Sequence, residues 1–285
     1  MRKAFEAWPK LKLAGKRTVI FGRSKEKLSE RILQDGPRIR IESSNGVITV
    51  LNGPERTVYD PAKNEIFTSH NPFGMPGFGF LPPPQAGPRR TMKFTETDGG
   101  KVADRRTRLV VATGAKGEET MRMYVDSDKG AVLRLEMTSP NGNLVMSFEY
   151  QAVKYDVEIP ARAFVLNYPN AKVVTVRDEV IRLAAKMGIK PYVISRNSGL
   201  RLDNSRVFEA DGRKVMRQTY VGERTRVSLF LCNGSVSPER LGKFGGGRLR
   251  SRVWTVGDLT LVLVGDVEEA DLARLQQQVQ VEQRG

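Results

Sequence analysis

The sequence predicts a mainly β protein that ends in a smaller α+β domain. Segments that alternate polar and apolar residues recur about every 8 to 12 residues between tight turns, a spacing typical of antiparallel sheets. Few segments combine a helical period with helix start and stop signals. At 285 residues, the chain can form one large or two ordinary domains, each with its own core.

A first strand meander is predicted near the N-terminal end. Residues 38–42 alternate polar and apolar, and Asn-Gly pairs at 45–46 and 52–53 turn the chain on either side of residues 47–51. A proline closes the next strand, at residues 58–61, because it cannot donate to a central ladder. This pattern predicts antiparallel pairing between neighbouring strands.

A second meander has strands at residues 101–113, 121–125, 132–138 and 144–150. Alternation places a consistent apolar set on one face, including four of the nine methionines. The set is Met121, Met123, Val125, Leu133, Leu135, Met137, Leu144, Met146, Phe148 and Tyr150.

This face has two interpretations. It can be an ordinary core, although sheet cores favour the stiffer Val and Ile side chains. Methionine is flexible and is over-used where a surface accepts varied apolar ligands. The composition therefore favours a ligand-binding face, formed by Met121, Met123, Leu133, Leu135, Met137, Leu144, Met146 and Phe148.

Residues 71–88 form a long segment between the meanders, with six prolines, four glycines and three phenylalanines. Such a segment is neither helix nor central strand. Long loops of this kind are functional or disordered. We expect a mobile flap over the apolar face, with a disordered spacer as the alternative. The flap residues that would contact a ligand are Phe73, Met75, Phe78 and Phe80.

The second half predicts a helix and then a strand-rich domain. Thr175 caps a helix that ends at Gly188, and we interpret this helix as a connector. A final helix has Asp266 as its N-cap and Glu269 three residues later, a capping-box pattern. Its expected buried stripe is Leu272, Leu275 and Val279. The strands between the helices are residues 207–210, 214–220, 225–232, 250–256 and 259–264.

These elements predict a large domain at residues 1–170, a connecting helix and linker at 171–192, and a small α+β domain at 193–285. No stretch approaches the length of an apolar membrane span. The N-terminal residues also lack the apolar region of a signal peptide, which is compatible with a cytosolic protein or with a signal that has been removed.

The net charge of +15 favours acidic partners such as an acidic protein, anionic lipid headgroups or nucleic acid. Residues 201–252 hold twelve basic and five acidic residues. A nucleic-acid-binding module is the alternative that this charge raises, but no recognisable nucleic-acid-binding signature accompanies it. The residues that we expect to bind a partner are Arg217, Arg224, Arg226, Arg248, Arg250 and Arg252.

The sequence offers little for catalysis, metal binding or a cofactor. Cys232 is the single cysteine and lies in an apolar run, which predicts a core residue. His70 is the single histidine, so it cannot build a multi-histidine metal site. A hydrolase would have to use acidic pairs such as Asp126 and Asp128, which lie in a predicted turn where aspartate is favoured. We predict no enzyme activity.

The order of several short motifs carries a family resemblance. They are Gln34–Arg40, Asn52-Gly53, Tyr59–Pro61, Tyr124–Asp126 with Gly130 and Arg134, Gly142 with Phe148, and Ile159-Pro160 with Phe164. In this order they resemble the bacterial outer-membrane lipoprotein carrier (LolA-like) superfamily. The resemblance implies a large open antiparallel half-barrel that encloses a helix and offers an apolar concave face to acyl chains.

The second half resembles the C-terminal domain of the sigma-E regulatory proteins of the RseB/MucB type. The motifs are Phe208–Arg213, Gln218–Tyr220, Val227–Phe230 and Leu261–Val267. The resemblance covers roughly residues 14–280 and departs from the family in its missing signal peptide and its long phenylalanine-rich segment. It implies a periplasmic protein without catalytic residues that senses lipid or misplaced lipoprotein and holds a membrane-anchored anti-sigma factor.

Residues and resemblance together predict a non-catalytic, extracytoplasmic lipid- or lipoprotein-binding protein. Its expected ligand is an acyl lipid or lipoprotein, its expected protein partner is an anti-sigma factor, and it could contact an anionic membrane surface. A carrier for envelope lipoprotein sorting is the alternative within this class. The second domain favours the regulator, because a simple carrier needs only the half-barrel.

Overall fold

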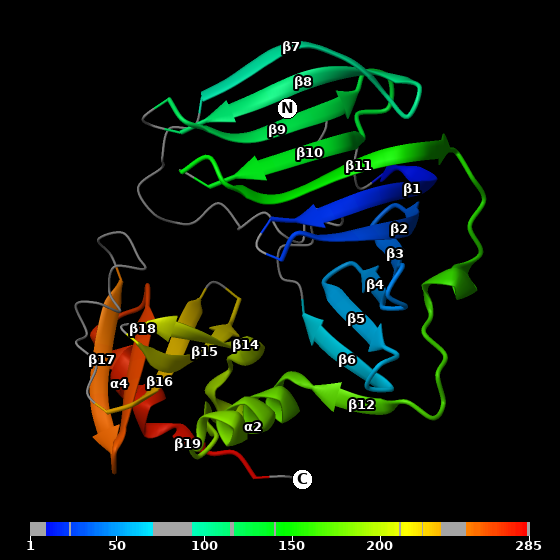
Figure 1. The fold of residues 1–285 in the computed structure, drawn as a ribbon. Coiled ribbons are helices and arrows are strands. Elements are labelled where there is room, and N and C mark those ends of the chain that lie inside the picture. Colours follow the sequence, from blue (N-terminus) through cyan, green and yellow to red (C-terminus); the bar gives the residue numbers. More distant parts are fainter. Residues whose placement is uncertain are drawn as a thin grey trace. The chain divides into compact units, whose positions relative to one another are not determined.

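The protein consists of two compact units, each described here by itself (Figure 1). Among the described residues, the first unit holds residues 10–66, His70 and residues 93–172, and the second holds Phe67–Ser69 and residues 173–283. The computed structural model describes residues 10–22, 24–70, 93–114, 117–139, 141–210, 212–223, 225–234 and 249–283.

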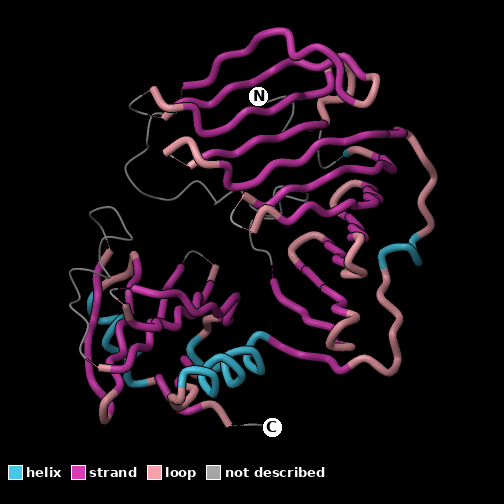
Figure 2. Tube along the Cα trace, viewed as in Figure 1, coloured by secondary structure: helices cyan, strands magenta, loops and turns pink. Residues whose placement is uncertain are grey.

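A 12-stranded open sheet contains the strands of the first unit (Figure 2). Its order is β12-β6-β5-β4-β3-β2-β1-β11-β10-β9-β8-β7. The predicted fold class is confirmed, because the chain is mainly β and this large sheet does not close. The strands are β1 (Lys12–Phe21), β2 (Glu26–Asp35), β3 (Arg38–Ser43), β4 (Ile48–Asn52), β5 (Glu55–Asp60), β6 (Glu65–His70), β7 (Lys93–Val102), β8 (Arg105–Thr113), β9 (Glu119–Asp126), β10 (Val132–Thr138), β11 (Leu144–Tyr155) and β12 (Lys172–Thr175).

Two meanders are joined at the centre of this sheet. Strands β1 to β5 pair with their sequence neighbours, as do β7 to β11, and all of these pairs are antiparallel. The join is the antiparallel pair β1·β11, which places Phe21 opposite Met146. Strands far apart in the sequence therefore share one face at the point where the meanders meet.

The core of the first unit lies on that face. Burial alternates along β1, where Leu13, Gly15, Arg17 and Val19 are buried and the residues that alternate with them are less so. The turn after β1 needs a glycine, since a Cβ on Gly22 would lie 1.7 Å from the carbonyl oxygen of Leu144. Within the described residues of this unit, the helical element is the 3₁₀ turn η2 (Ala161–Phe164), whose Phe164 is buried.

The second unit is a five-stranded sheet with helices packed in its main core. The sheet order is β14-β15-β16-β18-β17, and a short antiparallel pair joins β13 to β19. The elements are α2 (Val176–Met187), β13 (Tyr192–Ile194), η3 (Arg196–Ser198), β14 (Arg201–Ala210), β15 (Arg213–Val221), β16 (Arg226–Asn233), β17 (Arg250–Val256), β18 (Leu259–Gly265), α4 (Glu269–Gln277) and β19 (Val279–Val281).

Helix α2 has the predicted ends. The Thr175 side chain accepts a hydrogen bond from the backbone N–H of Asp178, whose carboxylate accepts one from the backbone N–H of Thr175, and Gly188 ends the helix with a φ of 69°. Only glycine adopts such a left-handed conformation at little cost. The apolar side of α2 packs into the core of the second unit through Val180 and Ala184, both at 0% exposure.

The start of helix α4 was predicted wrongly. The N-cap is Glu268 and makes no side-chain capping hydrogen bond, whereas Asp266 lies before the helix. Val279 also lies beyond the helix, in β19, where it pairs with Ile194 instead of extending the buried stripe. The pair β13·β19 accounts for the earlier end of the helix, because its backbone hydrogen bonds use the residues that would have continued the helix. No helix in the described ranges has the length and apolar character needed to cross a membrane.

Candidate ligand-binding face

Strand register assembles the predicted apolar residues into two rows across β9, β10, β11 and β1. Directly opposed side chains on one face of an antiparallel pair lie close enough to touch. The methionine row consists of Met121, Met137, Met146 and Phe21. The leucine row, two residues further along each strand, consists of Met123, Leu135, Phe148 and Val19.

Most of this face is buried. Met123 and Leu135 are each 2% exposed, and Met121, at the end of the methionine row, is 9% exposed. Leu133 is fully buried, whereas Leu144 at the β10–β11 hairpin is 38% exposed. The face is thus the inner surface of the first unit. The flap residues Phe73, Met75, Phe78 and Phe80 lie outside the described residues.

A cavity of about 390 Å³ borders the methionine row at Met121. Its polar wall is charged, and the guanidinium of Arg122 pairs with Glu119 at 2.7 Å. Met121 is the residue of the methionine row that lines it, whereas Arg122 and Glu136 are a cross-strand pair on the opposite face of the sheet. The lining residues are Glu118, Glu119, Met121, Arg122, Glu136, Thr138 and Gly142.

A third row on the same face is polar, and the sequence did not predict it. The polar row consists of Tyr150, Arg17, Glu30 and Ser43, on β11, β1, β2 and β3. Arg17 is 5% and Glu30 8% exposed. Arg17 Nε donates to Glu30 Oε2 at 2.7 Å, and the Ser43 hydroxyl donates to Glu30 Oε1 at 3.3 Å. A buried ion pair therefore lies beside the leucine row.

The four predicted partner-binding arginines that the structure describes are divided between the two faces of the small sheet. Arg250 and Arg252 on β17 pair with Glu268 and Glu269 beside helix α4. Arg217 on β15 lies opposite Phe230. Phe230 belongs to the second apolar cluster of the small sheet, which is formed by Val215, Phe230, Cys232, Val262 and Val264. The structure does not describe Arg224 and Arg248, and it places Arg226 at the start of β16.

Arg217 is the predicted arginine with the most unusual surroundings. Its Nε donates to the Ser228 hydroxyl at 3.2 Å, and its guanidinium lies 5.7 Å from the centre of the Phe230 ring. Burial, and then the charges of Arg206 and Arg226, lower the pKa of Arg217 to about 10. A half-buried cation beside like charges favours an anionic partner.

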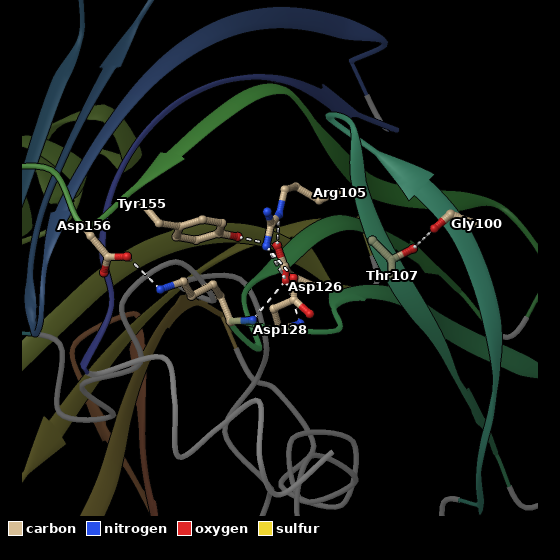
Figure 3. A network of polar contacts seen from close by, with 8 residues as sticks. Gly100, Arg105, Thr107, Asp126, Asp128, Tyr155 and Asp156 are labelled. Atoms are coloured by element: carbon tan, nitrogen blue, oxygen red, sulfur yellow. Dashed lines mark hydrogen bonds and ion pairs between the residues drawn. The ribbon is translucent and has the colours of Figure 1, made fainter.

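Asp126 and Asp128 hold a turn together (Figure 3). Asp126 is fully buried and accepts hydrogen bonds from Arg105 Nε at 2.9 Å and from the Tyr155 hydroxyl at 3.0 Å. It also accepts bonds from the backbone N–H groups of Asp128 and Lys129. Burial alone would raise the pKa of Asp126, but these bonds hold it below its ordinary value. The Asp126 carboxylate therefore serves to hold this turn together.

The other residue types considered for catalysis or metal binding are cysteine and groups of possible metal ligands. Cys232 is buried in the second cluster of the small sheet, as predicted, and burial raises the pKa of its thiol. Among the described residues, no group of three or more acidic, histidine or cysteine side chains could hold a metal ion.

Comparisons with known proteins give structural neighbours at low sequence identity. No known family model matches the sequence, and no curated protein matches it. MucB in the MucA/MucB complex of Pseudomonas aeruginosa is 15% identical, with 99% of this chain and 98% of that chain covered and a TM-score of 0.43. A conserved protein from Thermus thermophilus is 14% identical, with 61% of this chain and 95% of that chain covered and a TM-score of 0.44.

A third neighbour is an outer membrane lipoprotein-sorting protein domain from Vibrio parahaemolyticus. It is 8% identical, with 53% of this chain and 88% of that chain covered and a TM-score of 0.23. The structural neighbours thus include MucB and a lipoprotein-sorting domain, the two kinds of protein that the sequence motifs resemble.

Proposed function

We propose that this chain is a non-catalytic, extracytoplasmic protein that binds an acyl lipid or a lipoprotein in its first unit and a protein partner through its second. The observation that carries the proposal is the pair of apolar rows, which run without a break across β9, β10, β11 and β1. A cavity borders Met121 at the end of the methionine row.

The chemistry of the rows suits hydrocarbon chains of varied shape. Met121, Met137 and Met146 are opposed across three adjacent strands, so the row can repack without changing the backbone. Burial of an acyl chain contributes about 0.8 kcal/mol for each methylene group, which is enough for tight binding without a strong polar contact.

The second unit supports a signalling role over simple transport. A carrier needs only the acyl-binding unit, whereas the basic second unit offers Arg217 beside Phe230. We propose that it binds an acidic protein partner, with a membrane-anchored anti-sigma factor as the specific candidate. The alternative is a carrier that passes lipoproteins between envelope membranes.

The test is native mass spectrometry of gently purified protein, followed by organic extraction and lipid identification. The informative variant is Met137→Gln, because Met137 is partly buried at the centre of the methionine row. The matched control is Val145→Gln, on the opposite face of β11, where Val145 is 49% exposed.

We expect acyl lipid to co-purify with the wild-type protein and with Val145→Gln. We expect Met137→Gln to bind it about 5- to 10-fold more weakly, because an amide in an apolar contact is costly to desolvate. Equal lipid binding by a folded Met137→Gln variant would remove the methionine row from the site. A lipid-free protein that also ignores added diacyl lipopeptide would contradict the proposal.

A further inference from the structure

The Tyr150 hydroxyl is an unmet hydrogen-bond donor on the candidate acyl-binding face. The residue is 2% exposed, and its hydroxyl hydrogen meets no acceptor in the described part of the chain, while Arg17 acts on the hydroxyl oxygen as a charge and a donor. Buried hydroxyls are nearly always paired with protein or water, so an orphan one points to a missing acceptor. Burial raises the pKa of Tyr150 and outweighs the opposing effect of Arg17, which keeps the hydroxyl protonated and able to donate.

Tyr150 is held in place by its neighbours. Gly15 lies beneath the ring, since a Cβ at that position would come within 2.6 Å of Tyr150 Cε1. Phe148 meets the same ring edge-on, with the ring centres 6.2 Å apart. The hydroxyl therefore keeps a fixed position beside the leucine row, as a binding group must.

Arg17 adds further donors at the same place. Its Nε–H is used by Glu30, but a guanidinium carries five N–H groups in all. The Arg17 Cζ lies 4.7 Å from the centre of the Phe148 ring and 6.0 Å from that of Tyr150. Arginine, tyrosine and the apolar rows thus meet at one point of the face.

The charges of Arg17 and Glu30 decide whether a neutral or a charged acceptor fits beside Tyr150. Glu30 already neutralises Arg17 at 2.7 Å. A free carboxylate placed beside the pair would be a second buried negative charge without a counter-ion, which is strongly unfavourable. A carbonyl oxygen accepts the same hydrogen bonds without adding charge.

We infer that Tyr150, supported by Arg17, binds the carbonyl oxygen of an ester- or amide-linked acyl chain whose hydrocarbon lies along the leucine and methionine rows. This inference rests on the proposed function, because it names the polar group of the same ligand. Met146, Phe148 and Tyr150 alternate along β11, so the polar and methionine rows are about 13 Å apart at 3.3 Å per residue. Hydrocarbon that starts at the carbonyl would cross this span to reach the methionine row.

The test compares hexadecane, methyl palmitate and palmitate as competitors of a fluorescent hydrocarbon probe bound to the full chain. We expect wild-type protein to bind methyl palmitate about 5- to 10-fold more tightly than hexadecane, the value of roughly one hydrogen bond. Tyr150→Phe should lose this preference and keep its affinity for hexadecane. Palmitate should bind more weakly than its methyl ester.

A double variant checks the charge argument. Arg17→Met together with Glu30→Met removes both charges at similar volume, a change that buried ion pairs often tolerate. We expect the double variant to fold, to bind hexadecane and to show a reduced preference for the ester. An unchanged preference would assign the carbonyl to another group.

The outcomes separate this inference from the proposed function. Hexadecane binding with equal ester affinity in wild type and Tyr150→Phe would overturn the inference and leave the proposed function standing. Tighter binding of palmitate than of its ester would also overturn it. If the hydrocarbon probe does not bind, or binds but is displaced by no acyl compound, both the inference and the proposed function fail.

Discussion

The two units each bury a tyrosine completely, yet they treat its hydroxyl in opposite ways. In the second unit, the Tyr220 hydroxyl donates to Gln218 Oε1 at 2.5 Å and accepts from the backbone N–H of Ile194 at 2.9 Å. Gln218 in turn donates to the carbonyl oxygen of Tyr192 at 2.7 Å. In the first unit, the Tyr150 hydroxyl finds no acceptor for its hydrogen within the described ranges.

The core around Tyr220 has its polar groups paired within the protein, whereas the face around Tyr150 keeps an unused hydrogen-bond donor. The network at Tyr220 ties β13 to β15, so its polar atoms serve the fold. The polar row at Tyr150 satisfies Glu30 from two sides but leaves a donor beside methionine-rich apolar rows. A fully satisfied network stabilises and specifies a core, whereas a partly satisfied one is costly unless a ligand completes it.

The largest expected effect comes from breaking the ion pair in the polar row. Arg17→Met alone leaves the Glu30 carboxylate buried without its counter-ion, which should cost about 3 to 5 kcal/mol of unfolding free energy. Urea denaturation followed by circular dichroism measures this loss. The Arg17→Met/Glu30→Met double variant is the control and should recover most of it. A single variant as stable as wild type would mean that the pair is not buried in solution.

A second change tests how tightly the Tyr150 ring is held. Gly15→Ala places a Cβ within 2.6 Å of the ring and 2.9 Å of the Ala152 carbonyl oxygen. Such overpacking should cost about 1 to 3 kcal/mol. Gly142→Ala is a contrasting control because its Cβ meets no atom within 4 Å, although its φ of 77° adds backbone strain of its own. Denaturation midpoints compare the two, and an unaffected Gly15→Ala variant would show that the ring can move.

The two tyrosines themselves provide the most direct comparison. Tyr220→Phe leaves the Ile194 N–H and Gln218 Oε1 without their partner, which should cost about 2 kcal/mol. Tyr150→Phe removes a buried hydroxyl whose hydrogen has no acceptor in the described structure, so stability should stay the same or rise. Thermal unfolding of both variants gives the result. A loss at Tyr150 similar to that at Tyr220 would show that its hydroxyl is already satisfied within the protein.

The sequence predicted the apolar face better than the fold around it. Strands β9 to β11 were found because Met121 to Val125 and their counterparts alternate strictly. Strands β1 and β2 were missed because Gly15, Arg17, Glu30 and Gln34 occupy their inward positions, where periodicity expects apolar residues. Since β1 carries half of the polar row's ion pair, missing the strand meant missing the row.

The missed strands have a recognisable signal in retrospect. Leu13, Val19 and Ile32 stand at the right parity, and a charged pair of opposite sign, Arg17 and Glu30, interrupts both strands at cross-strand positions. No sequence pattern states that two such residues face each other, because pairing depends on register that the turn between them sets. The same limit applies to the arginines of β15 and β17, which the sequence grouped and the sheet separates onto two faces.

The smallest expected effect on stability concerns Arg217, where function and folding are expected to oppose each other. Its pKa of about 10 in the folded chain lies below the ordinary value for arginine, because burial, Arg206 and Arg226 disfavour the charge. A cation with a lowered folded pKa destabilises the fold at neutral pH, and this cost is relieved as pH rises above about 10, toward the higher pKa of the unfolded chain. Arg217→Met should therefore leave stability unchanged or slightly higher.

The same substitution should weaken binding of an acidic partner. The matched control is Arg201→Met, an exposed arginine at the start of β14, which changes net charge equally without removing the half-buried cation. Binding of a fluorescent acidic peptide at two salt concentrations measures the effect on partner binding, and thermal unfolding measures the effect on stability. If Arg217→Met lowers stability and leaves peptide binding equal to the control, the arginine serves the fold. Its unfavourable surroundings would then be offset by its hydrogen bond to Ser228 and its contact with Phe230.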